Sequence, residues 1–596
     1  MQHTRPTAWL KKIVFRHWIG ILIITVCTML YFAPIVLRMS TYIDGGDAMF
    51  NAWTLSRNYN CLTNNNCPKY TDANIYYPNK DTMLYSETQL SAGILTLPLH
   101  LVSNNPIFIY NFWTISSYLL AGLFMYFLAK YLSKNNEIIS IASGLIYAFA
   151  PIKLGVGATS HLQNLSIFYL PLIILLILKY IDSRSKKYLL GLTIALVLQF
   201  YASWYLLFFT LIALGAFIGT YILFRATTKK VILSLIATIM FAFILTLPLA
   251  KEYSRFSKDK NASFGISDQI KFSSSIADYI IPYSGTMSGR IWSAVFPNTR
   301  TTQYNPDSVS YHSYTLYLVG TFTVVASGFL LYKKRRDRKK SSEKSKYLLA
   351  IAFGTIGFCG LIFSLGPLIK IHQSFALGYT GEGIAVSLPG PWLLVTRLLP
   401  QLNFIRAIGR ISILCLFALC CSLALLPFIV KQLKIKKTIS VILYSLVAMG
   451  VLIELMPLRI YTLSSRPEAF NHYTPGVYKT IAKNPDIDNI IILRSRPEKK
   501  DDGFPFTRTE DVLWAGYHNK NIFNGYSGYE PTNYGAQMAD FIDLGKDDLK
   551  KMKDVGLKYV LIDKSLTPND SHLYIQAHAL LGKPIDSDER YILYKL

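Results

Sequence analysis

Charged residues are scarce in this sequence. Asp, Glu, Lys and Arg make up 16% of its 596 residues, and 52% of the residues are hydrophobic, whereas soluble domains contain roughly 25% charged residues. A chain of this length with so few charges cannot cover its apolar surface with polar side chains. The composition therefore argues against a soluble protein and predicts a chain that lies in a lipid bilayer.

Cysteine is also sparse. The seven cysteines include no Cys-x-x-Cys pair and no Cys/His set at metal-ligand spacing, so no metal site is predicted. Cys61 and Cys67 enclose five residues of a polar loop, CLTNNNC, and we expect a disulfide there if the compartment is oxidising. The other five lie in apolar runs and are expected to pack as small apolar side chains: Cys27, Cys359, Cys415, Cys420 and Cys421.

Acidic residues are few: 35 Asp and Glu stand against 61 Lys and Arg, which gives a net charge of +26. Such an excess can indicate a protein that binds nucleic acid. Here the basic residues lie in short segments between apolar runs, as they do in membrane proteins with a defined topology. We therefore expect no nucleic-acid partner.

Apolar runs of the length that spans a bilayer, about 20 residues, recur along the chain. The long stretch 187–224 is divided at 202–205, because a single helix would be too long. The first run follows three basic residues like a signal sequence, but it is long and lacks a small-residue cleavage site, so we expect an uncleaved anchor. The predicted spans are 17–37, 107–131, 137–153, 163–181, 187–203, 205–224, 231–249, 313–332, 347–366, 410–430 and 438–457.

The charges of the connecting loops predict an orientation. With the N-terminus in the cytoplasm, every strongly basic loop also lies there, as the positive-inside rule requires. The run 333–340, KKRRDRKK, could bind nucleic acid or anionic lipid, but because it abuts a span we interpret it as a topology anchor. An odd number of spans then puts residues 458–596 outside the cytoplasm.

The polar part of the chain is concentrated on that outer side. Outer loops are predicted at 38–106, 250–312 and 367–409, within a membrane region of residues 1–457. Residues 458–596 combine strand-like runs at 490–493 and 559–562 with a helix-like stretch at 547–555, which indicates a compact α/β domain. We therefore predict an α-helical polytopic protein of the cell membrane, with about eleven transmembrane helices and a C-terminal extracytoplasmic α/β domain.

One carboxylate lies directly beyond the first span. Asp47 follows TYIDGG and precedes residues 48–59, where apolar and polar side chains mix as in a helix lying in the membrane interface. A carboxylate at this surface can act as a base toward an acceptor hydroxyl. It can equally cap the interfacial helix, and the spacing alone does not decide between the two roles.

Several motifs resemble those of a group of bacterial membrane proteins placed among the C-type glycosyltransferases. They are GGDAMFNAW, YYPNKDTMLYSE, NNPIFIYNF, GLIYAFAPIKL, SHLQNLSIFYLPL, LNFIRAIGRISIL, NGYSGYEPTNY and DVGLKYVLID. The resemblance covers nearly the whole chain. It implies an enzyme that moves a sugar from a polyprenyl-phosphate carrier to a glycan, lipid or protein acceptor of the envelope, at the outer face of the membrane.

The resemblance also implies roles for individual residues. Asp47 matches the essential acid of the first outer loop and would take the acceptor's proton or orient the acceptor. Many members carry paired acids in this loop. Asp44 is a possible partner, but its spacing differs from theirs, which leaves open whether a divalent metal takes part.

Further candidates lie on the predicted outer side. Arg406 and Arg410, four residues apart and thus expected on one helix face, would bind the phosphate of the donor, with Arg397 as a third candidate. They could instead snorkel and fix the end of the helix. Glu87 is either a site residue or part of a salt bridge in the loop, and His161 is either catalytic or structural.

Two other functions compete with sugar transfer. A transporter or flippase of lipid-linked intermediates should carry ionisable residues or broken helices at mid-membrane, and the predicted spans are nearly free of charge. A non-catalytic envelope scaffold, with the tail binding a partner, should be indifferent to substitution of Asp47.

Overall fold

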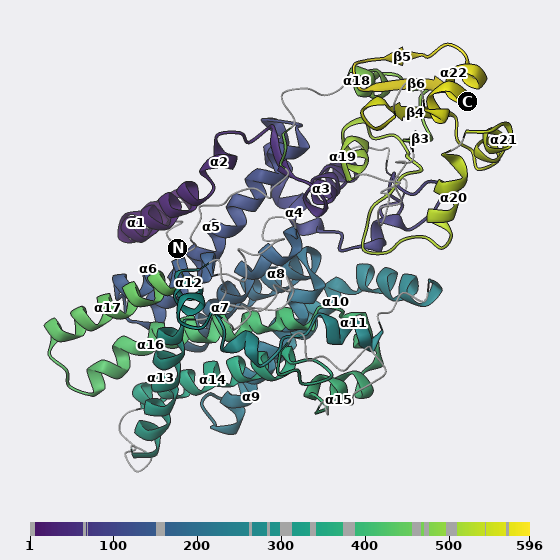
Figure 1. Ribbon diagram of the computed structural model, residues 1–596. Helices are drawn as coiled ribbons and strands as arrows, with labels where there is room; N and C mark the ends of the chain where they lie inside the picture. Colours follow the sequence, from purple (N-terminus) through teal and green to yellow (C-terminus); the bar gives the residue numbers. More distant parts are fainter. Residues whose placement is uncertain are drawn as a thin grey trace.

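The computed structural model describes residues 6–63, 67, 69–150, 161–260, 265–282, 286–297, 313–333, 341–372, 388–455, 467–469, 476–495, 509–542, 544–567 and 571–596 (Figure 1). The tripeptide Asn-Ala-Ser at 261–263 and most of the basic run 333–340 lie outside these residues.

Each predicted span coincides with a helix. The helices are α1 (Pro6–Tyr31), α5 (Pro106–Leu132), α6 (Glu137–Phe149), α7 (Tyr169–Ser183), α8 (Lys186–Ala202), α9 (Trp204–Leu223), α10 (Lys229–Asp259), α13 (Tyr314–Lys333), α14 (Ser341–Ser364), α16 (Ile413–Gln432) and α17 (Lys437–Leu455). Eight helical segments in the described part of the chain are long and apolar enough to cross a membrane. Residues His17–Tyr31 of α1 and the helix α6 are shorter apolar helices, and α8 has 17 residues. The protein is a polytopic α-helical membrane protein.

Local sequence fixes where these helices begin and end. Asn105 caps α5, its side chain accepting from the N–H groups of Ile107 and Phe108, and Pro106 occupies the first helical position. The predicted division near residue 203 is confirmed: Ser203 is extended, with φ −160°, and its hydroxyl caps α9 by accepting from the N–H of Leu206. The break therefore has a defined polar side chain at its centre.

Helix α16 lies at the centre of the membrane region. Leu414, Phe417 and Leu425 are fully buried, and the helix packs against α5, α6, α13 and α14. An apolar helix surrounded by other helices is the expected centre of a membrane bundle, because its side chains need no polar face. The short helix η9 (Ile408–Ser412) directly precedes α16 and carries Arg410, a residue of the candidate site.

The C-terminal residues form a small α/β unit. Strands β3 (Ile490–Leu493) and β4 (Tyr559–Asp563) are parallel, and β4 pairs antiparallel with β6 (Tyr591–Lys595), which pairs with β5 (Asp586–Ser587). The predicted strands at 490–493 and 559–562 are confirmed, and the stretch 547–555 matches α21. The accompanying helices are α18 (Gly476–Lys483), α19 (Thr509–His518), α20 (Tyr534–Phe541), α21 (Lys546–Asp554) and α22 (His572–Leu581).

The first outer loop packs into this unit. Helix α3 (Asp47–Thr63) contacts α19 (Figure 1), and a Cβ on Gly516 of α19 would lie 3.3 Å from Ser56 Cβ. The indole of Trp53 donates to Asn74 Oδ1 at 3.0 Å, and the Asn74 amide donates to the Ala515 carbonyl at 2.9 Å. Strand β1 (Tyr42–Asp44) also pairs antiparallel with β2 (Pro467–Ala469). Loop and tail therefore share one core.

The position predicted for α3 was wrong. The helix forms where the sequence indicates, but eleven consecutive residues, 48–58, are buried, whereas a helix lying in the membrane interface exposes its polar face to water. The tail covers the face that the sequence suggests is solvated.

Candidate active site

Asp47 lies where the first outer loop turns from β1 into α3. Gly46 makes the turn with φ +71°, in the left-handed region that glycine adopts without strain, and its N–H donates to Thr509 Oγ1 at 3.1 Å. Asp47 Oδ2 lies 3.1 Å from His161 Nε2, and Oδ1 accepts a 2.7 Å hydrogen bond from the hydroxyl of Tyr526. Three distant segments thus meet at one carboxylate.

The contacts of Asp47 differ from those of a residue that only caps α3. Asp47 is the first residue inside α3 rather than the residue before it, and a capping side chain turns its oxygen toward the helix's own N–H groups. Here the two carboxylate oxygens contact an imidazole and a phenol from elsewhere in the chain. The side chain is about one-third exposed, so a substrate hydroxyl can reach it.

Asp44 lies in β1 and is buried. Among the described residues, groups of three or more His, Cys, Asp and Glu that could hold a metal ion do not occur.

The short helix η4 (Leu162–Phe168) connects Asp47 to Arg410. His161 precedes it, and the N–H of Asn164 donates to the His161 carbonyl at 2.9 Å. The Asn164 side chain in turn accepts from Arg410 Nη1 at 3.4 Å. One turn of chain therefore directs His161 toward Asp47 and Asn164 toward Arg410.

Glu87 is buried beside the break between α8 and α9. Ser203 Oγ donates to Glu87 Oε1 at 2.7 Å, and the N–H of Tyr205 donates to the same oxygen at 3.5 Å. Burial raises the pKa of Glu87 to about 7, while Ser203, the Tyr205 N–H and then Arg410 act in the opposite direction. A carboxyl group poised near neutral pH can give or take a proton.

The three arginines differ in their surroundings. The prediction that Arg406 and Arg410 share a helix face was wrong. Residues 405–407 are non-helical, and η9 begins only at Ile408. The Arg406 backbone N–H donates to the hydroxyl of Tyr205 at 2.7 Å, and its guanidinium lies over the ring of Phe272, 4.8 Å from the centroid. Arg397, on α15 (Pro391–Leu398), is exposed. Arg410 is therefore the arginine whose guanidinium contacts η4, whereas Arg406 meets the start of α9 through its backbone.

The burial of Glu87 predicts a pH-dependent stability. Between about pH 4.5 and 7 the folded protein keeps a proton on Glu87 that the unfolded chain has already lost. The stabilisation that this proton gives the folded state is therefore complete below about pH 4.5 and is lost as the pH rises through about 7. We expect the thermal unfolding midpoint of the wild type to fall relative to that of Glu87→Gln between about pH 5 and pH 8. Glu530→Gln, at an exposed carboxylate, is the control. Parallel curves for wild type and Glu87→Gln would contradict the assignment.

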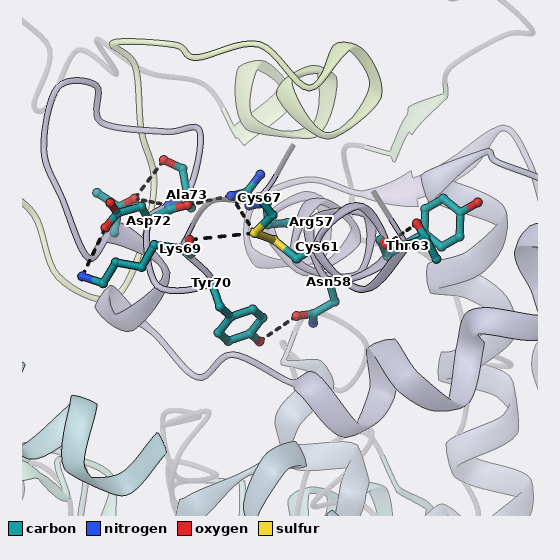
Figure 2. Close-up of a disulfide and its surroundings, with 11 residues drawn as sticks. Arg57, Asn58, Cys61, Thr63, Cys67, Lys69, Tyr70, Asp72 and Ala73 are labelled. Carbon is teal, nitrogen blue, oxygen red and sulfur yellow. Dashed lines mark hydrogen bonds and ion pairs between the residues drawn. A yellow bond between two sulfur atoms is a disulfide. The ribbon is translucent and has the colours of Figure 1, made fainter. Parts of the chain in front are cut away.

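The disulfide partners expected in the first loop are joined in the structure. Cys61, in the last turn of α3, is bonded to Cys67 with an S–S distance of 2.02 Å (Figure 2). Nearby, Arg57 Nη2 contacts Cys67 Sγ at 3.3 Å, and the hydroxyl of Tyr70 donates to Asn58 Oδ1 at 2.7 Å. The loop that follows α3 is thus held back against the helix that begins with Asp47.

Several residues of the site escaped the sequence analysis: Ser203, Tyr205, Asn164 and Tyr526. Asn164 and Tyr526 lie within the motifs SHLQNL and NGYSGYEPTNY, but nothing in the motifs indicates their contacts. Ser203 and Tyr205 mark the division between two spans. A polar residue at such a division was the one available signal, because it must satisfy the freed backbone groups.

No protein-family model and no curated protein sequence matches the chain. Solved structures do. The oligosaccharyltransferase of Archaeoglobus fulgidus in its apo form is 10% identical over 96% of this chain and 72% of that chain, with a TM-score of 0.49. The arabinofuranosyltransferase AftD from Mycobacteria is 11% identical over 97% of this chain and 41% of that one, with a TM-score of 0.46. ArnT from Cupriavidus metallidurans is 11% identical over 98% of both chains, with a TM-score of 0.38. All three TM-scores lie below 0.5, so what this chain does has to follow from its own residues.

Proposed function

We propose that this protein is a membrane glycosyltransferase that moves a sugar from a polyprenyl-phosphate carrier to an envelope acceptor at the outer face of the membrane. The observation that carries the proposal is the partly exposed Asp47 carboxylate, held between His161 and Tyr526 and joined through η4 to Arg410. A base and a phosphate-binding cation on one framework are what this reaction needs. The motif resemblance supplies the substrate class.

The proposed reaction is a displacement at the anomeric carbon of the sugar. The acceptor oxygen forms the new bond to that carbon, and its proton passes to Asp47. The bond from the carbon to the phosphate oxygen breaks, and its electron pair leaves with the polyprenyl phosphate. Arg410 and Arg406 stabilise the charge that develops there, because arginine forms paired hydrogen bonds to phosphate oxygens.

The direct test is transfer by the purified protein in nanodiscs, with a panel of polyprenyl-phosphate sugars as donors. Mass spectrometry of envelope glycans from cells with and without the gene identifies the product. Absence of transfer from the whole panel, together with unchanged envelope glycans, would contradict the proposal.

Arg410 provides a test of the donor site. We expect Arg410→Ala to raise the KM for the donor on the order of 10- to 100-fold, because a hydrogen bond to a charged group contributes about 1.5–3 kcal/mol, with a smaller change in kcat. Arg290→Ala, at an exposed arginine on α12 (Met287–Val295), is the matched control and should leave the KM unchanged. An unaltered KM in Arg410→Ala would remove this residue from the donor site.

The proposed orientation has the N-terminus in the cytoplasm and the C-terminal domain outside. Cysteine introduced at Ser341, at the start of α14, should resist an impermeant thiol reagent in intact cells, and cysteine at Ser571, before α22, should react. The reverse labelling would put the site on the cytoplasmic side.

A further inference from the structure

We infer that the C-terminal domain is part of the active site, with Tyr526 as a positioning residue that holds the Asp47 carboxylate and Thr509 as the residue that fixes the turn before it. This inference rests on the proposed function for its catalytic consequence. Its structural content, a tail docked on α3 with a hydroxyl bonded to Asp47, can be measured without any transfer reaction.

Tyr526 is held by contacts on both sides of its segment. The side chain of Asn524 accepts from the N–H of Ile492 at 2.8 Å and donates to the Ile492 carbonyl at 2.9 Å, which ties the segment to β3. On the other side, the N–H of Tyr76 donates to the Asn524 carbonyl at 3.1 Å, which ties it to the first outer loop. The Tyr526 ring also packs edge-on against Phe50 of α3, 6.0 Å between centroids. The hydroxyl is therefore held in place rather than free to swing.

Thr509 makes a second contact from the tail to the same turn. It is the first residue of α19 and accepts from the N–H of Gly46, directly before Asp47. The next two residues, Glu510 and Asp511, are both buried in ion pairs within the tail. Because the start of α19 is anchored in the tail, the hydrogen bond from Gly46 to Thr509 fixes the turn that carries Asp47 relative to the tail.

The Tyr526 hydroxyl is suited to hold a carboxylate. Burial and then the adjacent Asp47 raise the pKa of Tyr526, so the hydroxyl stays protonated at neutral pH and donates. A carboxylate oxygen has lone pairs for more than one hydrogen bond, so Asp47 can accept from Tyr526 and still receive the proton of an acceptor. Fixing the base in this orientation keeps it within reach of the attacking hydroxyl.

Docking is tested by a cross-link. A Cβ on Gly516 would lie 3.3 Å from Ser56 Cβ, near the separation of about 3.5–4.5 Å found in disulfides. We expect full-length Ser56→Cys/Gly516→Cys protein to form this bond in most molecules on mild oxidation, mapped by mass spectrometry. The pair Thr63→Cys/Gly516→Cys, whose first site lies about 10 Å further along α3, should not cross-link.

The hydrogen bond is tested by Tyr526→Phe, which removes the hydroxyl and keeps the ring. With Asp47→Ala, which removes the acceptor, it forms a double-mutant cycle, in which the shifts of the unfolding midpoint should not add, because the two residues are in contact. The matched control is Tyr529→Phe, whose ring contacts Tyr85 and Phe256 and whose cycle with Asp47→Ala should be additive. In the transfer assay, Tyr526→Phe should lower kcat about tenfold with the donor KM unchanged, and Tyr529→Phe should behave as wild type.

The outcomes separate the two proposals. Cross-linking of the near pair with a non-additive cycle supports the inference, and a loss confined to kcat extends it to catalysis. Failure of the cross-link, an additive cycle, or wild-type kcat in Tyr526→Phe overturns it. If the wild type transfers no sugar, the proposed function fails, and the cross-link and the cycle still decide whether the tail holds Asp47.

Discussion

Replacing Asp47 by asparagine is expected to slow sugar transfer on the order of 10²–10⁴-fold, because the amide cannot accept the proton of the acceptor hydroxyl. Asparagine keeps the size of the side chain and is nearly as good a helix cap as aspartate. A residue that only starts α3 would therefore tolerate this change. The measurement is the initial rate of transfer by purified protein in nanodiscs at saturating donor.

Two comparisons make this result specific. The unfolding midpoint of Asp47→Asn should stay near that of the wild type, which separates loss of the base from loss of the fold. Asp540→Asn replaces an exposed carboxylate on α20 and should transfer at the wild-type rate. Full activity in Asp47→Asn would remove the catalytic assignment and favour the scaffold interpretation.

The helices of the membrane region could be predicted because each depends on its own residues. A run of about 20 apolar side chains must satisfy its backbone hydrogen bonds internally once it enters lipid, and only a helix does so within one segment. Even the division at Ser203 follows from local length. What length could not indicate is that this serine also donates to Glu87, 116 residues away.

Local sequence patterns could not predict the contacts that build the site. Tyr526 and Asp47 are 479 residues apart, and no periodicity relates them. The mixed polar and apolar sequence of α3 fits a helix at a membrane surface and a helix buried against a polar domain equally well. Which of the two forms depends on whether the tail packs on α3, and the sequence of α3 does not contain that information. Arg406 and Arg410 have helical spacing, but the chain between them includes the non-helical stretch 405–407.

A buried ion network in the tail determines whether α19 can hold its position. Arg494 is 1% exposed at its side chain, and its guanidinium donates to Asp511 on α19 at 2.8 Å and to Asp563 at the end of β4 at 3.3 Å. Arg590 forms two 2.7 Å hydrogen bonds to Glu510. The network therefore clamps the start of α19 to the ends of the parallel strands.

Removing the buried partner of two carboxylates should be far more damaging than losing a surface ion pair. Burial raises the pKa of Asp563, but Arg494, Ser565 and Arg590 lower it by more, so that the pKa lies below its usual value. The folded tail therefore favours the charged form of this carboxylate. Arg494→Met leaves Asp511 and Asp563 buried without that cation, and we expect it to destabilise the tail by about 3–5 kcal/mol. Hydrogen exchange in β4 of the full-length protein measures the loss.

The matched variants test the cause of that loss. Arg590→Met should cost less, because the Arg590 side chain is 29% exposed, so water can enter the space it leaves beside Glu510, and Asp563 keeps Arg494 as a partner. Arg494→Met combined with Asp511→Leu should recover part of the stability, since the second change removes one of the uncompensated charges. Because α19 carries Thr509 to the turn before Asp47, transfer by Arg494→Met should fall at the temperature where β4 loses its protection. Transfer that persists after the tail has opened would show that Asp47 works without it.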